Sequence, residues 1–520
     1  MRRQRNAITW SLCACILAVT GCGSSTPAYQ YQAEDVTAKL KKADTAYGAE
    51  DYSKAADLYL DAMESDPKNI DARLGDVRCR IAMEQYGTAL SDLGIAAMID
   101  PQNDDIYDLY LQISDEQGTH DAAMQALSVA RQYGNATFLA KVPAEPSVSL
   151  AGGSYDSPEE IELSTDDDSA EIYYSLHNED HSLRSVDLKY NGPIHLYRGT
   201  TTVTAYSLKD SIPSDELTVE YKLDYEPRAV TFSDPIMEKV VRQQLDLPEG
   251  DITDEQLETI TELETNNLQN DADYSWDKKD QFQIESYEDL NQMPYLQELY
   301  VRENQKQFPD LSNSNLPYLD YIFFDPYSYD SGTVTVKSLD TLTNQQSLTA
   351  IRTLDCDVLD ISAVNNLPYL RELYIDSAKV QNLTETLSKK TLQYVEFNGD
   401  ALQDYSTLIA NKNITYVEID GWNFDRDALG QMTWLTELDL DGDYSTSDSH
   451  ELKDLSFLTG MKNLQYLYLR YVNDPVELEP LKSMTWLQEL RLYNCKAVDD
   501  HPDVLAELQE ALPNTTIDTD

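Results

Sequence analysis

Tyrosine and carboxylate side chains recur at alternate positions in several short segments, between leucines that keep a constant spacing. The frame of residues 367–378, LPYLRELYIDSA, returns as MPYLQELYVREN, MTWLTELDLDGD, MKNLQYLYLRYV and MTWLQELRLYNC. Alternate side chains of a β-strand point to opposite faces, so the leucines and the residues between them lie on opposite sides. Tyrosine combines a large contact area with a hydroxyl and recurs with arginine at binding surfaces. The pattern predicts a binding face, although β-propensity alone also favours tyrosine on exposed strands.

The candidate binding residues occupy these intervening positions. If the repeated strands form a curved array with the leucines inside, these positions face its concave side. Of 27 such positions, eight are tyrosine, 11 are acidic and four are arginine, in a chain with 35 tyrosines among 520 residues. A surface of this composition favours a basic or polar partner. The residues chosen are Tyr300, Arg302, Tyr321, Arg352, Tyr374, Tyr394, Glu396, Tyr416, Glu418, Tyr466, Tyr468, Arg491 and Tyr493.

Motifs for catalysis are missing from the sequence. It contains no G-x-S-x-G, no H-E-x-x-H and no phosphate-binding glycine loop. Asp439, Asp441 and Asp443 have the spacing that opens a calcium loop, but Tyr444 stands at the sixth place, which requires glycine, and His450 at the twelfth. We therefore predict a protein that is not an enzyme and that holds no cofactor and no metal ion.

Length and charge limit the remaining possibilities. At 520 residues the chain is too long for one hydrophobic core, and roughly 150 residues per domain suggests three or four domains. The 93 acidic residues outnumber 39 Lys and Arg, for a net charge of −54. A nucleic-acid partner is excluded, because nothing offers the clustered basic residues that phosphate contacts need.

The amino terminus indicates export. MRRQRN is a basic segment, AITWSLCACILAV is apolar, and Val19-Thr20-Gly21 precede Cys22. A small residue before a cysteine resembles the bacterial lipobox, which implies that residues 1–21 are a signal peptide and that Cys22 carries a diacylglyceryl group. The acyl chains would anchor the protein at the outer face of the cytoplasmic membrane, or at an outer membrane if the organism has one. Residues 22–33 would form a tether, and an ordinary signal peptide is the alternative.

A repeat of 34 residues follows the tether. Tyr52, Ala55, Tyr59, Ala62, Asp66 and Pro67 are answered by Tyr86, Ala89, Leu93, Ala96, Asp100 and Pro101, and a weaker third copy contains Ala123, Leu127 and Ala130. Small residues let helices approach closely, and proline ends the second helix of each pair. Residues 34–136 resemble tetratricopeptide repeats, which implies an α-helical solenoid whose groove can hold peptides. A purely structural spacer is the alternative.

The pattern changes from helical to strand periodicity near residue 137. Short strands are expected at Ile161–Leu163, Ile172–Ser175, Ile194–Leu196, Thr202–Tyr206 and Leu217–Tyr221, which together indicate a small β-sandwich at 145–225. The segments AEIYYSL, YNGPIHL, TTVTAYS and VEYKL resemble the immunoglobulin-like C-terminal module of chitobiases and hexosaminidases. That family has a short turn after its IYY strand, whereas this chain has SLHNEDHSLRSVDLK.

The remainder, 228–520, carries the leucine frame. The first leucine or its equivalent falls at 296, 319, 348, 370, 392, 414, 435, 464 and 487, a period near 22 residues. This spacing indicates leucine-rich repeats, an α/β solenoid with one short strand per turn of a horseshoe. VLDISAVNNLPYL resembles the internalin-like bacterial class, and FSDPIMEKVVRQQL resembles the helical N-terminal cap of that family. The asparagine that usually follows the frame is mostly absent.

The expected architecture is therefore multidomain, with a helical solenoid, a β-sandwich and a leucine-rich horseshoe. The function predicted from it is that of a cell-surface lipoprotein, a non-catalytic scaffold that binds a protein partner through the concave face, whose acidity favours a basic partner. The alternative is a surface protein that binds a cell-wall or host glycan.

Overall fold

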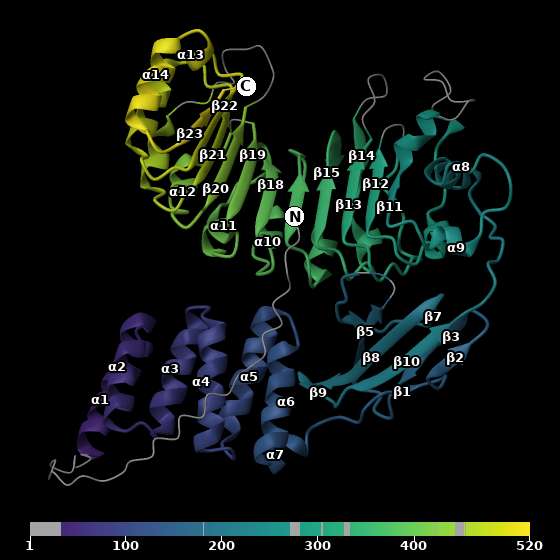
Figure 1. Cartoon of the computed structure of the whole chain (residues 1–520). Helices are drawn as coiled ribbons and strands as arrows, with labels where there is room; N and C mark the ends of the chain where they lie inside the picture. The colour runs from purple at the N-terminus through teal and green to yellow at the C-terminus, as the bar shows by residue number, and fades with distance from the viewer. Residues whose placement is uncertain are drawn as a thin grey trace, which may run out of the picture. The chain divides into compact units, whose positions relative to one another are not determined.

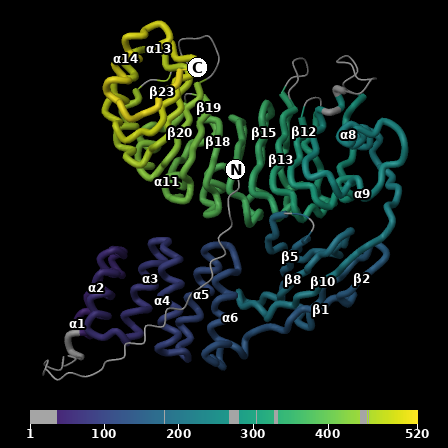
Figure 2. The backbone as a smooth tube through the Cα atoms, viewed as in Figure 1, coloured from purple at the N-terminus to yellow at the C-terminus, as the bar shows by residue number. Residues whose placement is uncertain are grey.

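The computed structural model describes residues 33–520 apart from 180, 182, 271–280, 303–304, 327–332, 422, 443–451, 453 and 520. The predicted signal peptide and Cys22 lie outside the described residues. The chain separates into two compact units, Met1–Pro101 and Gln102–Asp520 (Figures 1 and 2). The predicted helical domain 34–136 spans this division.

The first unit is helical. Its helices are α1 (Ala33–Tyr47), α2 (Tyr52–Ser65), α3 (Ile70–Ala82) and α4 (Tyr86–Ile99). Consecutive helices pack against one another, and their contacts are made by fully buried small residues such as Ala55, Ala62 and Ala89. Alanine allows this close approach because it has no side chain beyond Cβ. The side chains of Asp51 and Asn69 cap α2 and α3 by accepting hydrogen bonds from free backbone N–H groups.

Gly75 marks the tightest helix contact in the first unit. A Cβ at this position of α3 would lie 2.3 Å from Cε1 of Tyr59, a buried side chain whose hydroxyl donates to Asp44 Oδ1 at 2.6 Å. We expect Gly75→Ala to lower the free energy of unfolding by about 1 kcal/mol, because overpacking outweighs the gain in helix propensity. Gly87→Ala in α4 is the control, since nothing lies within 4 Å of its Cβ, and it should stabilise by about 0.5–1 kcal/mol. Thermal unfolding followed by far-UV circular dichroism measures both, and equal stability of the two variants would contradict the packing argument.

The second unit begins with a helical hairpin. It contains α5 (Asp104–Gln117), α6 (Asp121–Tyr133) and the short α7 (Ala136–Leu139). Gly118 and Gly134 end α5 and α6 in the left-handed conformation, with φ of 65° and 71°. The hairpin is tied to the following sandwich, since the Arg131 guanidinium lies 2.6 Å from the Asp215 carboxylate.

The sandwich consists of short antiparallel pairs around one larger sheet. Its strands are β1 (Ser147–Val148), β2 (Gly153–Tyr155), β3 (Glu159–Ile161), β4 (Leu163–Ser164), β5 (Glu171–Asn178), β6 (Leu188–Lys189), β7 (Ile194–Leu196), β8 (Gly199–Lys209), β9 (Ile212–Pro213) and β10 (Leu217–Leu223). The larger sheet runs β2-β10-β8-β5-β6, while β1 pairs with β4 and β3 with β7. Buried residues alternate along β5, as expected for a strand with one face in the core. Strands β5 and β8 extend beyond the predicted ranges because each continues its register past the apolar stretch.

The horseshoe is an 11-stranded parallel sheet in chain order. Its strands are β11 (Glu262–Glu264), β12 (Glu298–Arg302), β13 (Tyr321–Asp325), β15 (Ala350–Thr353), β17 (Glu372–Ile375), β18 (Tyr394–Asn398), β19 (Tyr416–Asp420), β20 (Glu437–Asp441), β21 (Tyr466–Arg470), β22 (Glu489–Tyr493) and β23 (Thr516–Asp518). A second parallel pair joins β14 (Val334–Val336) and β16 (Cys356–Val358). The end strands β11 and β23 lie outside the leucine frame and were not predicted.

Short helices precede the first strand of the horseshoe and connect its later strands. At the amino-terminal end are α8 (Pro235–Gln244), α9 (Asp254–Leu257), η1 (Thr265–Asn270) and η3 (Glu288–Gln292). Between the repeats are η4 (Asp340–Leu342), η5 (Ser362–Asn366), α10 (Leu383–Thr386), η6 (Gly399–Ala401), α11 (Ser406–Ala410), α12 (Arg426–Leu429), η7 (Leu455–Gly460), η8 (Pro475–Ser483), α13 (Lys496–Asp499) and α14 (Pro502–Ala511). The sheet is curved, and α11, α12 and α14 lie on its outer side (Figure 1).

Buried amides in the turns replace the asparagine ladder that the sequence lacks. The Asn411 amide donates to the carbonyls of Leu387 and Lys389, both at 2.9 Å. Gln345 donates to the carbonyls of Leu311 and Ser314 at 3.0 and 2.7 Å. Both side chains lie before a strand, whereas the asparagine of the family follows one. They donate hydrogen bonds to turn carbonyls of the previous repeat, which would otherwise lack donors.

The sandwich and the horseshoe share a hydrophobic core. Tyr295 and Tyr318 of the horseshoe are buried within the apolar cluster of the sandwich. The Asn178 amide donates to the Tyr295 hydroxyl at 2.9 Å, and the Arg184 guanidinium donates to the Asp320 carboxylate at 2.8 Å. The long segment that follows β5 therefore contacts the horseshoe through its described residues. This contact was not predicted from the sequence.

Candidate binding surface

The concave face of the horseshoe carries the side chains that alternate with the leucines. In β12, β19, β21 and β22 every second residue is buried, and the others are partly exposed. The frame leucines pack into one continuous core that runs from Met237 to Leu512. The curvature of the sheet therefore gathers the intervening side chains on one inner surface.

The strand register arranges these side chains in rows that cross the sheet. In the middle row, residues from adjacent strands are direct neighbours. Neighbouring strands are about 4.8 Å apart, which brings side chains of one row into contact. In chain order the row is Tyr300, Phe323, Arg352, Tyr374, Glu396, Glu418, Asp439, Tyr468 and Arg491. Three consecutive carboxylates thus occupy its centre, between aromatic and arginine groups.

Arginine guanidinium groups lie against aromatic rings at both ends of the row. Arg302 lies 5.0 Å from the centre of the Phe323 ring, and Arg352 lies 5.4 Å from that of Tyr374. At the other end, Arg491 lies 4.9 Å from the Tyr468 ring. These cation–π contacts and nearby acids already occupy the arginines.

Tyrosine hydroxyls on this face donate to carboxylates two residues away. Tyr300 donates to Glu298 at 2.6 Å, Tyr374 to Glu372 at 3.1 Å and Tyr416 to Glu418 at 2.7 Å. Tyr394 remains the most exposed of the tyrosines, at 36%, and its ring centre lies 5.8 Å from that of Tyr416. The pairs fix ring orientation, which reduces the entropy lost when a partner binds.

The central carboxylates are buried together and are incompletely paired. Glu396 is 4% exposed and Asp439 is 5% exposed. Glu396 Oε2 and Asp439 Oδ1 accept no hydrogen bond from any described residue. Arg352 Nη2 is 3.3 Å from Glu396 Oε2, an ion pair without hydrogen-bond geometry, and Arg470 Nη2 is 3.5 Å from Asp439 Oδ2.

Burial and mutual repulsion hold these carboxyl groups away from their usual ionisation. Burial, followed by the charge of Glu418, raises the pKa of Glu396. The same two causes raise the pKa of Asp439 to about 7. Burial and the neighbouring Glu396 raise the pKa of Asp420 to about 9. Like charges in register destabilise a sheet, so this arrangement costs stability in the absence of a cation.

The predicted binding residues all lie on strands of this one sheet, from Tyr300 on β12 to Tyr493 on β22. The structure brings the central ones together, and it separates the Arg302 and Arg491 ends by the intervening strands. The prediction selected tyrosines, arginines, Glu396 and Glu418 but left out Asp420, Asp439 and Arg470. Their positions between the frame leucines could have indicated that they lie on this face. Their burial and incomplete pairing could not be predicted from the sequence.

The cysteines and acidic clusters of the described residues show neither disulfides nor metal sites. Cys79, Cys356 and Cys495 are buried free thiols. No group of three or more His, Cys, Asp or Glu side chains in the described parts of the chain is arranged to hold a metal ion. Asp443 lies outside the described residues. Among described helices, none is both long and apolar enough to cross a bilayer.

Comparisons with known proteins address the modules separately. Residues 150–219 match the family described as the chitobiase/beta-hexosaminidase C-terminal domain, which confirms the resemblance predicted for the sandwich. No curated protein matches the chain. The repeat spacing and the parallel sheet define a leucine-rich repeat protein that also contains a helical region and a β-sandwich.

Similar solved structures include leucine-rich repeat proteins of bacteria. An internalin, InlF, of Listeria monocytogenes is 17% identical, and the match covers 55% of this chain and 88% of that one, with a TM-score of 0.35. Internalin C2 of the same organism is 18% identical over 51% of this chain and 97% of its own, with a TM-score of 0.30. A leucine-rich repeat protein of Leptospira interrogans is 15% identical over 44% and 74%, with a TM-score of 0.25.

Proposed function

We propose that this protein is a non-catalytic interaction scaffold that binds a protein partner through the concave face of its horseshoe. The observation that carries the proposal is the row of Glu396, Glu418 and Asp439, whose carboxylates lie in register. Glu396 and Asp439 are buried, and each keeps one carboxylate oxygen without a hydrogen-bond donor among the described residues. Such an arrangement costs stability without serving the core, and conflicts of this kind are expected at functional sites.

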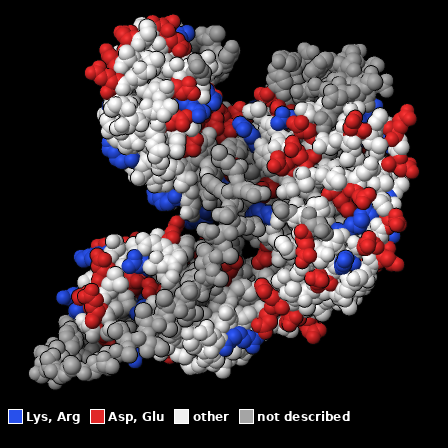
Figure 3. Space-filling model, viewed as in Figure 1, with Lys and Arg blue, Asp and Glu red and all other residues white. Residues whose placement is uncertain are grey.

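The chemistry of the row favours a partner with arginine or lysine side chains. A guanidinium group offers five N–H donors in a planar fork, which suits adjacent carboxylates. The flanking Tyr374, Tyr416 and Tyr468 would cover the aliphatic part of such a side chain. The acidic surface attracts a basic segment over longer distances, and Figure 3 shows Asp and Glu spread widely over the visible face.

The cellular setting belongs to the same proposal. We infer that Cys22 is lipidated after removal of residues 1–21 and that the folded part is held at the outer surface of the membrane. The helical repeats proposed in 34–136 are a second candidate region for a protein partner. The −54 net charge supports an exported role, since a high charge keeps a crowded surface protein soluble.

Replacing Tyr374, Tyr394, Tyr416 and Tyr466 together by alanine tests the concave face. We expect the variant to lose the partner that the unchanged protein captures from envelope extract, because four anchoring rings are removed. The captured protein is then purified, and its affinity for each variant is measured by titration. A loss of at least about 100-fold is expected from several hot-spot rings acting together.

The same four tyrosines changed to phenylalanine provide the matched control. Phenylalanine keeps the ring area and loses the hydroxyls, so most of the affinity should remain if the rings supply contact area. Unchanged binding by the alanine variant would show that the partner binds elsewhere, and it would direct attention to the helical repeats.

A further inference from the structure

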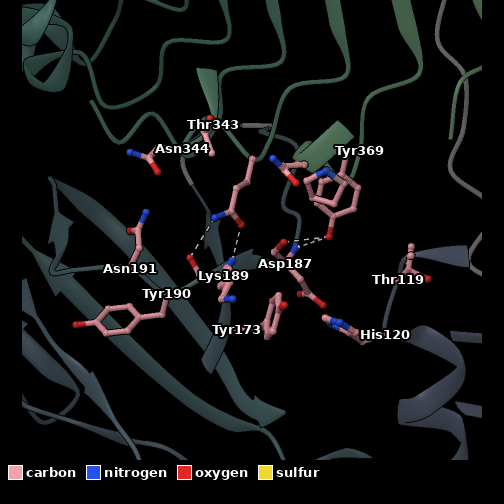
Figure 4. A pocket seen from close by; sticks show the side chains of 14 residues that line it. Thr119, His120, Tyr173, Asp187, Lys189, Tyr190, Asn191, Thr343, Asn344 and Tyr369 are labelled. Atoms are coloured by element: carbon pink, nitrogen blue, oxygen red, sulfur yellow. Dashed lines mark hydrogen bonds between the residues drawn. The ribbon is translucent and has the colours of Figure 1, made fainter. Parts of the chain in front are cut away.

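A cavity of about 450 Å³ lies where the α5–α6 turn, the sandwich and the horseshoe meet (Figure 4). The turn contributes Thr119 and His120, the sandwich contributes Tyr190 and Asn191, and the horseshoe contributes Asn344 and Asn366. Its volume falls within the range of small-molecule sites, which is about 300–1,000 Å³. The concave-face residues are not part of its lining.

Hydrogen bonds between the modules hold the walls of this cavity in place. The Tyr369 hydroxyl donates to the backbone carbonyl of Asp187 at 3.0 Å, and the Asp187 N–H lies 3.2 Å from the same hydroxyl. The Lys189 N–H donates to Gln346 Oε1 at 2.7 Å. A cavity braced in this way exists before any ligand enters, which lowers the entropic cost of binding.

The charged groups of the lining are already engaged. Lys189 Nζ lies 2.5 Å from Glu171 Oε1, and Asp187 Oδ2 accepts from the Tyr206 hydroxyl at 2.9 Å. The His120 ring nitrogen Nδ1 lies 2.6 Å from that same hydroxyl, and burial lowers the pKa of His120, so its ring is neutral at pH 7. In a chain with a net charge of −54, this cavity offers neutral groups to a ligand.

The free polar groups are carboxamides and a phenol. The Asn191 and Asn366 side chains and the Tyr190 hydroxyl make no hydrogen bond with the described residues, and Asn344 uses only its Nδ2, which donates to the Ser312 carbonyl at 2.8 Å. Figure 4 shows Asn191, Asn344 and the Tyr190 ring on one side of Lys189, with Tyr369 and His120 on the other. Each free amide offers both a donor and an acceptor.

We propose that this cavity is a binding site for a neutral saccharide. Neighbouring sugar hydroxyls are both donors and acceptors and match paired amides, while aromatic rings cover the C–H face of a pyranose. An anionic sugar would gain no unpaired cation here, because Lys189 is engaged by Glu171. The site is independent of the proposed function, since it shares no residue with the concave face.

Calorimetric titration of the purified full chain tests the site with defined probes. The neutral disaccharides diacetylchitobiose and cellobiose are compared with digalacturonic acid and with a neutral tetrapeptide. We expect at least one neutral disaccharide to bind and the anionic one to bind more weakly. The double change Asn191→Ala with Asn366→Ala should weaken that binding about tenfold, because it removes two sets of hydrogen bonds.

Three further variants keep the test decisive. Gln381→Ala with Gln509→Ala removes two exposed carboxamides outside the cavity and should leave the affinity unchanged. Asn366→Trp, a second variant at an exposed position, should abolish binding by filling the cavity. The four-tyrosine alanine variant of the concave face should still bind the sugar. Binding of neither neutral disaccharide, binding of the tetrapeptide alone, or full affinity in the double variant would each overturn the proposal.

Discussion

Raising the pH from 6.5 to 8.5 is expected to lower the free energy of unfolding of the horseshoe by about 2–4 kcal/mol. Glu396, Asp420 and Asp439 have pKa values raised by burial and by nearby carboxylates, to about 9 for Asp420 and about 7 for Asp439. Unfolded carboxyl groups ionise near pH 4, so in this window the folded chain binds more protons than the unfolded chain. Stability therefore falls as pH rises, by about 1.4 kcal/mol per unit for each group still protonated in the folded state.

Two groups have pKa shifts that would make stability rise with pH, but they change it little over most of the range from pH 6.5 to 8.5. Burial lowers the pKa of His120, whose contribution changes only below its unfolded value of about 6.5. Burial also lowers the pKa of Lys389 to about 8, so it adds stability only near the upper end. Urea unfolding at several pH values measures the slope. A horseshoe whose stability is constant or increases with pH would contradict the account, and Glu396→Gln should flatten the decline.

The triple change Glu396→Gln, Glu418→Gln and Asp439→Asn is expected to weaken binding of an arginine-rich peptide about 100-fold, since it removes three adjacent charged acceptors for a cation. The same variant should be more stable than the unchanged protein at pH 8, by about 1–3 kcal/mol, because like-charge repulsion in register is removed. Fluorescence anisotropy with a labelled peptide gives the affinity, and urea unfolding gives the stability. Opposite signs in the two measurements distinguish a binding site from a structural cluster.

A control variant separates the site from the overall acidity. Glu385→Gln, Asp427→Asn and Glu510→Gln neutralise the same number of exposed carboxylates on the short helices. This variant should reduce affinity only slightly and mostly at low salt, where long-range attraction matters. Equal losses in both triples would mean that net charge alone attracts the peptide, and the carboxylate row would then have no specific role.

Periodicity made much of the fold predictable. The leucines at the frame positions are buried, and the strand that each one precedes joins one parallel sheet, because a strand with alternating apolar residues has only one way to face the core. Strands β11 and β23 escaped prediction because they are three residues long and carry a single core residue or none, as Glu262–Glu264 illustrates. These two strands form because each pairs with a neighbouring strand, and their own pattern of apolar residues does not predict them.

The site was predictable in outline but not in its energetics. Frame positions located Tyr374, Glu396 and Glu418 on one face, since alternation alone decides which way a side chain points. The exposed fraction of Glu396 depends on its neighbours in adjacent repeats, and no local pattern reports it. The cavity was beyond reach for a similar reason. It joins Asn191 to Asn366, residues far apart in the chain whose proximity depends on how modules pack.

The shared core of sandwich and horseshoe also has an evolutionary consequence. Tyr295 and Tyr318 pack among apolar residues of the sandwich, and Asn178 donates to the hydroxyl of Tyr295. A horseshoe transplanted without its sandwich would present these two rings to water, and a different sandwich would lack the asparagine that satisfies the buried hydroxyl. Recombination at the boundary near residue 226 would therefore yield poorly folded chimaeras, so the two modules are expected to be inherited as a pair.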